Sequence, residues 1–392
     1  AQVSIFAQAM RMQEQCCTAH PRPPSRPCAT AMRFILVGSV ASALAGVQAS
    51  PQPVAAPPPE AAKAGVPSWC RLIPERLLPR RCVIRAGAGG EACGRLSAEE
   101  RGRTPACAYD EREALEMAYV SVATFCDEDA LASWTCGKPC QELPRMESPR
   151  FIHAPEVGGH ALVGKLRGSC VLAFRGTDSL MAWGQNLRSL DLARLEGCEV
   201  EGRSCRVGLG FNESYRALSL DIRRSFAAIG CTKASPLLVT GHSLGAALAT
   251  LAVFDLSRSG YRVTKAYTFG SPRVGDDAFA AAFNANAVLK KLLSFRVARG
   301  DDPYVYMPTD SAFRHVGTEV YYPGNTGRGH RICESSGEDS PCLGRTGGGD
   351  IAAMLLQCVI PATCGHMRYF QPEMRGLMGR WSCRSWPKEI LP

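Results

Sequence analysis

The feature that most constrains the fold is a short, glycine-bounded turn between an apolar strand and a helix of small residues. The strand expected over Pro236–Thr240 runs directly into Gly241-His242-Ser243-Leu244-Gly245, which has the pattern G-x-S-x-G. The Ala- and Leu-rich segment that follows predicts a helix over Leu244–Arg258. Glycines on both sides of the serine permit a sharp turn and close packing of strand against helix. This order predicts a nucleophile elbow, a turn that presents the Ser243 hydroxyl.

Strands and helices alternate on both sides of this turn. Strands are expected at 161–163, 170–174, 263–269 and 294–298, and helices at 110–125, behind Asp110 as N-cap, and at 276–293. The alternation predicts an α/β domain with a central, mostly parallel sheet flanked by helices.

A serine becomes a useful nucleophile only with a base, and the base needs an acid that orients it. In α/β hydrolases the order along the chain is Ser, then Asp or Glu, then His. Both Asp301 and Asp302 follow an expected strand and fit by position, whereas Asp276 and Asp277 are expected to cap a helix.

The histidines that follow the turn are separated by their surroundings. His366 lies in a late loop and is the expected base. His315 opens an apparent strand and is expected to be structural, and His330 lies in a Gly- and Arg-rich loop and is expected to be exposed. The side chain of His242, next to the serine, is expected to point away from the apex of the turn.

Two backbone N–H groups are needed to hold an oxyanion, and Leu244 supplies one candidate. Thr177 follows a buried strand and Gly176, and it offers both an N–H and a hydroxyl. A helix is expected next, with Leu180, Trp183, Leu187 and Leu190 on one face. Such a helix could form a lid, although this spacing alone favours an ordinary core helix.

The N-terminal region contains no segment that predicts a packed domain. We expect residues 1–31 to be an over-extended start, 32–49 to be a secretory signal, and 50–108 to be a Pro-, Arg- and Cys-rich linker or pro-region ahead of the domain 109–392. The chain has 19 cysteines. Because the 16 that follow the signal could pair completely, the sequence favours disulfides in an extracellular protein. The pairing of Cys70, Cys82, Cys93 and Cys107, within this Cys-rich extension, is left open.

Several functional classes are excluded by composition and motif. The formal net charge is +9, without a Lys/Arg cluster, so no nucleic-acid partner is expected. The longest apolar run is too short to span a membrane. Cys136 and Cys140 have a spacing seen in metal sites, but no second pair repeats it, so no metal and no other cofactor is expected. The protein is expected to be a monomer.

Taken together, these stretches resemble the class 3 lipases, a family of fungal extracellular triacylglycerol lipases with the α/β-hydrolase fold. The resemblance covers roughly residues 110–383. It rests on a series of short strings in a fixed order: Phe125-Cys126, Trp134-Thr135-Cys136, Phe174-Arg175-Gly176-Thr177, Gly210-Phe211-x-x-Ser214-Tyr215, Gly241-His242-Ser243-Leu244-Gly245, Tyr267-Thr268-Phe269-Gly270-Ser271-Pro272, His315-x-Gly317-x-Glu319 and His366-x-x-Tyr369-Phe370.

The resemblance implies a role for particular residues. Asp302, six residues before Pro308, matches the family's acid, and His366 and Thr177 match its base and its oxyanion residue. The stretch after Thr177 matches the family's mobile lid. The implied disulfides are Cys126–Cys383, Cys136–Cys140 and Cys198–Cys205, with Cys333–Cys342 as a weaker suggestion.

The chain departs from the family at three places near these residues. Arg299 replaces an Asn that often precedes the acid by three residues, Pro303-Tyr304-Val305 replaces Val-Pro, and Asn186 replaces an Asp in the lid.

The sequence therefore predicts a secreted serine hydrolase that cleaves acylglycerol esters at an oil–water interface, with transient contact to a lipid surface. Two alternatives remain. The first is a soluble-ester esterase of feruloyl type, or a phospholipase, on the same fold. The second is a lipid-binding protein without catalytic activity, which the filled Ser243, Asp302 and His366 positions disfavour.

Overall fold

The computed structural model describes residues 105–177, 191–323, 329–333, 338, 342, 349–358, 363–370 and 383. All of them belong to the second of two compact units, which spans Val66–Pro392. The expected signal, most of the linker, and Cys70, Cys82 and Cys93 lie outside the described residues. So do the expected lid residues Leu180, Trp183 and Leu187.

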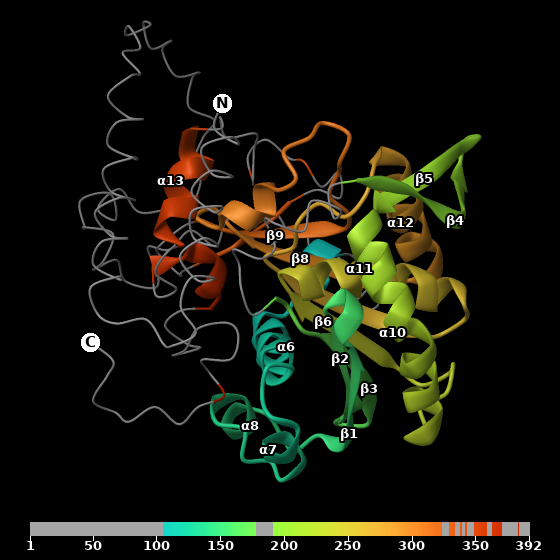
Figure 1. Cartoon of the computed structure of the whole chain (residues 1–392), viewed down its shortest axis with the longest axis vertical. Coiled ribbons are helices and arrows are strands. Elements are labelled where there is room, and N and C mark those ends of the chain that lie inside the picture. Colours follow the sequence, from blue (N-terminus) through green and yellow to red (C-terminus); the bar gives the residue numbers. More distant parts are fainter. Residues whose placement is uncertain are drawn as a thin grey trace, which may run out of the picture. The chain divides into compact units, whose positions relative to one another are not determined.

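Eight strands of the described residues form one sheet in the order β1-β2-β3-β6-β7-β8-β9-β10 (Figure 1). The strands are β1 Glu147–Ala154, β2 Gly159–Leu166, β3 Ser169–Phe174, β6 Leu237–His242, β7 Val263–Phe269, β8 Leu293–Arg299, β9 Thr318–Tyr322 and β10 Arg331–Ile332. Strands β3, β6, β7, β8 and β9 run parallel, while β1, β2 and β10 pair antiparallel at the edges. The expected mostly parallel sheet is therefore confirmed.

Helices cover both faces of this sheet. Helices α10 (Leu209–Ala228) and α11 (Leu244–Arg258) pack on one face, and α6 (Glu111–Ala123) packs on the other. Helix α12 (Asp277–Lys290) packs beside α11 and against a separate hairpin, β4 (Leu192–Val200) and β5 (Arg203–Gly208). The shorter helices are α5 Pro105–Ala108, α7 Glu128–Ala132, α8 Lys138–Glu142 and α13 Gly349–Gln357, with 3-10 turns η4 Pro155–Val157, η6 Pro303–Tyr306 and η9 Gly365–Met367.

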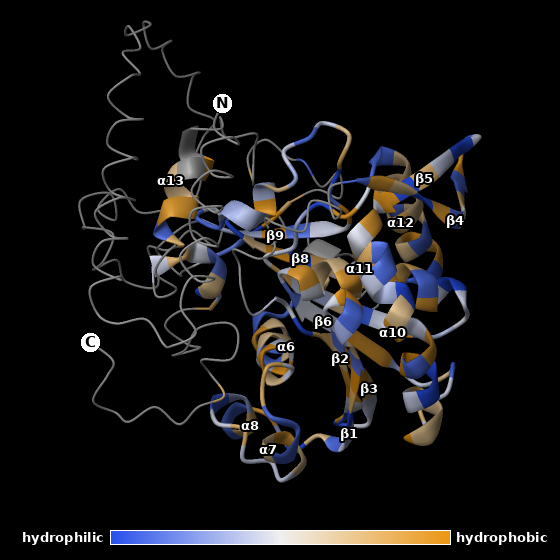
Figure 2. Ribbon diagram, in the orientation of Figure 1, coloured by the Kyte–Doolittle hydropathy of each residue, from blue (hydrophilic) through white to orange (hydrophobic). Residues whose placement is uncertain are grey.

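The alternation of side chains along the strands divides the apolar residues into two cores. Leu172 and Phe174 of β3 face the core beneath α10 and α11, whereas Val171 and Ala173 face the core beneath α6. Helix α11 is apolar on nearly every side, because it lies between the sheet and its neighbouring helices (Figure 2). Within the described part of the chain, no helix is both long and apolar enough to cross a lipid bilayer.

Six disulfides join described cysteines. They include the three pairs that the family resemblance implied, Cys126–Cys383, Cys136–Cys140 and Cys198–Cys205, and also Cys333–Cys342. The sequence analysis did not foresee Cys170–Cys231 or Cys358–Cys364. Cys107 is also disulfide-bonded.

Candidate active site

Ser243 occupies the junction between β6 and α11, as the G-x-S-x-G pattern predicts. Its backbone has φ 61° and ψ −126°, a left-handed conformation that costs a non-glycine residue free energy. A hydrogen bond of 2.9 Å from the Ser243 amide to the carbonyl of Phe269 fixes the turn to β7. The side chain lies only 5% exposed, above the first turn of α11.

The two glycines of the pattern are required because backbone atoms fill the space on either side of the turn. A Cβ at Gly241 would lie 2.2 Å from the carbonyl oxygen of Gly245, and a Cβ at Gly245 would lie 2.2 Å from that of Phe174. Neither position has room for a methyl group. The strained serine conformation is thus held by close packing of β3, β6 and α11.

Asp302, in the turn that follows β8, and His366, in η9, form a fully buried pair. The Nδ1 of His366 donates to Asp302 Oδ2 at 2.8 Å, and both side chains are 0% exposed. Asp302 also accepts hydrogen bonds from the Tyr369 hydroxyl at 2.7 Å and from the Tyr304 amide at 2.9 Å. Burial acts to raise the pKa of Asp302, but the neighbouring His366 and these three donors outweigh it and hold the pKa below its usual value.

The other ring nitrogen of His366 is left available. His366 Nε2 is buried and has no hydrogen-bond partner among the described residues. Because the Asp302 carboxylate accepts from Nδ1, the lone pair of the imidazole lies on Nε2 whenever the ring is neutral. This is the atom that would accept the proton of a serine hydroxyl.

His242 lies beside the base. Its ring centroid is 4.4 Å from that of His366, and its Nε2 donates a 2.8 Å hydrogen bond to the backbone carbonyl of His366. Burial, followed by the charge of His366, lowers the pKa of His242 to about 3, so this ring stays neutral. The sequence analysis gave His242 no role beyond the elbow, since no single-sequence pattern indicates a contact 124 residues away.

Thr177, the expected oxyanion residue, lies in a segment that packs against the elbow. A Cβ at its neighbour Gly176 would lie 2.8 Å from the carbonyl oxygen of His242 and 3.3 Å from Ser243 Cβ, so this segment packs directly on the elbow. The hydroxyl oxygen of Thr177 is buried and has no partner among the described residues. Leu244 begins α11, where the first amides of a helix lack partners within the helix.

Two of the histidine predictions need correction. His315 is buried and its Nε2 donates a 2.8 Å hydrogen bond to the Val305 carbonyl, which fits a structural role, but strand β9 begins only at Thr318. His330 is not exposed as expected. Its side chain is 27% exposed and packs against the rings of Tyr109 and Tyr322, because β10 folds back on β9.

The remaining acidic candidates have structural roles. Asp276 caps α12, as expected, by accepting from the Phe279 amide at 2.9 Å. Asp301 accepts a pair of 2.8 Å hydrogen bonds from Arg299, while Asp302 is the acid that contacts His366.

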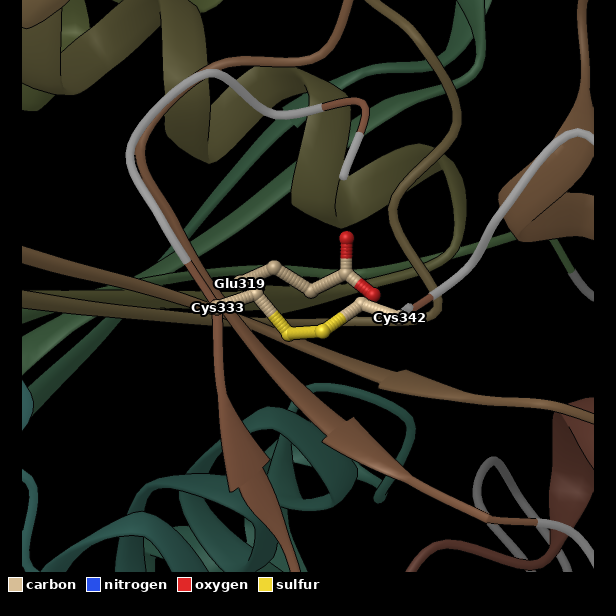
Figure 3. A group of neighbouring side chains, drawn as sticks. All are labelled: Glu319, Cys333 and Cys342. Carbon is tan, nitrogen blue, oxygen red and sulfur yellow. A yellow bond between two sulfur atoms is a disulfide. The ribbon is translucent and has the colours of Figure 1, made fainter. Parts of the chain in front are cut away.

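One group of described side chains has the geometry of a metal site. Glu319, Cys333 and Cys342 converge within 4.8 Å, but the two sulfurs are joined to each other (Figure 3). The Glu319 carboxylate accepts a 2.8 Å hydrogen bond from Arg296 Nη2, with both side chains buried. Because thiolate ligands are consumed by the disulfide and the carboxylate is paired, this donor set does not fit a metal ion.

A cavity of about 390 Å³ lies between β1 and α10, lined by Arg150, Phe151, Ile152, His153, Asp221, Arg224, Ser225 and Ala228. None of these residues belongs to the Ser243 site, so this cavity is not the space in which Ser243 would act.

The sheet order and the strand–turn–helix junction at Ser243 define an α/β-hydrolase fold. Residues 171–311 match the family model described as lipase (class 3), which confirms the resemblance indicated by the sequence strings.

The chain is similar to proteins of several sources. It is 31% identical over 220 residues to a secreted mono- and diacylglycerol lipase from Fusarium solani, which covers 53% of this chain and 62% of that protein. It is 30% identical over 190 residues to a phospholipase A1 from Oryza sativa subsp. indica, and the match covers 39% of this chain and 42% of that protein. The chain thus spans less than two thirds of either relative. A lipase structure from Rhizopus microsporus var. chinensis shares the fold, with a TM-score of 0.53, 22% identity, and coverage of 74% of this chain and 91% of that one.

Proposed function

We propose that this protein is a serine ester hydrolase that acts on acylglycerols through an acyl-enzyme. The observation that supports this most directly is the buried Asp302–His366 pair, which contacts the strained Ser243 turn through His242. The Nε2 atom of His366 has no hydrogen-bond partner within the described part of the chain. Such an arrangement supplies a proton acceptor, an acid that orients it and a serine hydroxyl, which are the three groups that acyl transfer needs.

In this mechanism, Ser243 Oγ attacks the ester carbonyl carbon and its proton passes to His366 Nε2. Asp302 fixes the tautomer of the ring and stabilises the imidazolium that forms. The imidazolium then gives its proton to the departing alcohol as the acyl–oxygen bond of the ester breaks. A water molecule hydrolyses the acyl-enzyme by the same proton route, releasing the fatty acid and restoring the Ser243 hydroxyl.

The negative oxygen of each tetrahedral intermediate is held by the amides of Leu244 and Thr177, with the Thr177 hydroxyl as a third donor. Each such donor is typically worth about 3 kcal/mol of transition-state stabilisation. The buried Thr177 hydroxyl, which has no partner among the residues that the structure describes, supports this assignment, since a buried polar atom is costly unless a ligand satisfies it.

Acylglycerols are the proposed substrate class because the Fusarium relative is named a mono- and diacylglycerol lipase. Secretion is proposed on that relative's name, on the signal-like residues 32–49, and on the six disulfides, which persist in oxidising compartments. A lid over the site, carrying Leu180, Trp183 and Leu187, is proposed from the family resemblance. A phospholipase activity is the second candidate, favoured by the similarity to the Oryza phospholipase A1.

Replacing the nucleophile tests the mechanism. We expect Ser243→Ala to lower kcat on a short-chain ester by about 10⁴-fold or more, with the thermal unfolding midpoint nearly unchanged. A fluorophosphonate probe should label Ser243 in the wild-type chain and fail to label the variant. As a matched control, Ser219→Ala on α10 should retain full activity. Hydrolysis that survives in Ser243→Ala would contradict the mechanism.

The substrate form is tested by measuring rates below and above the solubility limit of the ester, on tributyrin and on phosphatidylcholine vesicles. A lidded lipase should show a sharp rise in rate once droplets form, because opening the lid exposes apolar surface that oil covers. A flat, saturating curve would contradict the lid, and faster hydrolysis of the phospholipid would favour the second candidate.

A further inference from the structure

Arg299 and Asp301 form a buried pair beside the site, at the point where β8 ends. Arg299 Nε and Nη2 each donate a 2.8 Å hydrogen bond to one oxygen of the Asp301 carboxylate. The side chains are only 4% and 18% exposed. Bidentate pairs of this kind combine charge with a fixed geometry, so they hold the two residues in one relative orientation.

The same guanidinium also reaches the loop that carries the base. Arg299 Nη1 donates a 2.6 Å hydrogen bond to the backbone carbonyl of Arg368, two residues beyond His366. On the other side of His366, Gly365 packs so tightly that a Cβ there would lie 2.2 Å from the carbonyl oxygen of Asp301. Arg299 and Asp301 therefore contact the His366 loop before and after the imidazole.

The acid is one residue from this pair. Asp302 follows Asp301 directly, and its amide donates a 3.2 Å hydrogen bond to the carbonyl of Arg299. Within the segment 299–302, Asp302 is the acid, and Arg299 and Asp301 contact the loop that carries His366.

We propose that Arg299 is a positioning residue that joins the acid-bearing and base-bearing loops and so sets the geometry of the Asp302–His366 pair. Its role rests on the proposed hydrolase function. This is a position at which the chain departs from the Asn common in the class 3 lipases. Arginine suits the role because its planar fork can bind a carboxylate along one edge and a carbonyl with the remaining nitrogen, which neither Asn nor Lys can do.

The pair also places charge close to the site. Burial acts to lower the pKa of Arg299, but Asp301, Tyr369 and Asp302 together raise it, so the guanidinium stays charged. Burial raises the pKa of Tyr369, whose hydroxyl donates to Asp302. Of the pair, Arg299 acts to lower this pKa and Asp301 acts to raise it. The titratable groups that pack around the pair and His366 are His242, Asp302, Tyr304, Tyr322 and Tyr369.

The test compares Arg299→Gln, Arg299→Lys and Asp301→Asn with the wild-type full chain on a soluble short-chain ester. Because small misplacements of catalytic groups are costly, we expect Arg299→Gln and Asp301→Asn to lower kcat by about tenfold to hundredfold with little change in KM. Arg299→Lys keeps the positive charge but lacks the planar guanidinium, so it should recover only part of the lost kcat.

The pH–rate profile gives a readout that loss of stability alone would not produce. Arg299→Gln removes a cation and leaves the Asp301 anion, so the midpoint of the acid limb should move to higher pH, by up to about one unit. Asp301→Asn removes an anion and leaves the cation, so the midpoint should move to lower pH. Shifts of opposite sign would support the proposal.

Arg223→Gln provides the matched control. Arg223 pairs with Asp255 at 2.7 Å between α10 and α11, away from the site, and its loss should lower the unfolding temperature without moving the pH profile. The positioning role is overturned if the Arg299 and Asp301 variants resemble this control, or if both shift the profile in the same direction. If the wild-type chain neither hydrolyses esters nor reacts with the fluorophosphonate probe, the proposed function itself fails.

Discussion

At the scale of single residues, Gly270 illustrates how tightly the site is packed. It has φ +59°, and a Cβ there would lie 2.8 Å from His366 Cε1, 2.9 Å from His366 Nδ1 and 3.0 Å from Asp302 Oδ2. We expect Gly270→Ala to displace the imidazole and lower kcat by about a hundredfold. Steady-state kinetics on a soluble ester, with unfolding temperatures, would measure this.

Gly168 offers the control, because it separates backbone strain from displacement of the base. It has φ +77° in the turn between β2 and β3, and a Cβ there would meet no atom within 4 Å. Gly168→Ala should cost about 1–2 kcal/mol of stability, from the left-handed backbone alone, and leave kcat unchanged. Equal kinetic effects from the two alanines would show that Gly270 does not constrain His366.

At the scale of elements, local signals predicted some segments to the residue and missed others. Helix α11 and strand β7 have the bounds expected, because glycines mark the start of one and β-branched and aromatic residues are frequent in the other. Helix α10 went unrecognised as a helix, although its buried side chains, from Phe211 through Leu218 and Ile222 to Phe226, recur at helical spacing. The first described helix, α5, begins at Pro105, ahead of the expected start near Asp110.

The residues of the candidate site were likewise only partly predictable from local sequence signals. The spacing of the residues could not choose between Asp301 and Asp302, and only the family resemblance favoured Asp302, which the structure places against His366. Neither source pointed to the hydrogen bond from His242 to the His366 carbonyl or to the one from Arg299 to Arg368, because a hydrogen bond to a backbone carbonyl leaves no trace in the identity of the acceptor residue.

Two helix caps provide a test at this scale. The exposed Asp110 caps α6 by accepting hydrogen bonds from the amides of Arg112 and Glu113. The buried Asp276 caps α12 and also accepts from the Arg206 amide and side chain of β5, at 3.1 Å each. We expect Asp110→Ala to cost about 1 kcal/mol and Asp276→Ala about 2–4 kcal/mol, because the latter leaves the buried amide of Phe279 and the part-buried amide of Arg206 without a partner. Urea unfolding measures both; equal costs would mean that Asp276 acts as a cap only.

At the scale of the whole molecule, two buried histidines should set the stability in mild acid. Burial lowers the pKa of His242 to about 3 and, with the charges of Arg296 and Arg273, holds that of His315 well below its usual value. In the unfolded chain both would titrate near pH 6.5. The unfolded state therefore binds more protons than the folded state below that pH, so stability is fully present above about 6.5 and falls as the pH decreases.

Each histidine should contribute a slope of about 1.4 kcal/mol per pH unit below the unfolded pKa, for His242 down to a pH of about 3. Asp302, whose folded pKa is lowered, adds a further loss only below its unfolded value of about 4. Urea unfolding at pH 5, 6, 7 and 8 should therefore show a decline that starts well above the carboxylate range. His315→Gln keeps an amide donor for the Val305 carbonyl but cannot titrate, so it should remove about half of the slope between pH 5 and 6. A variant whose stability falls with pH as steeply as the wild type would show that His315 takes up no proton on unfolding.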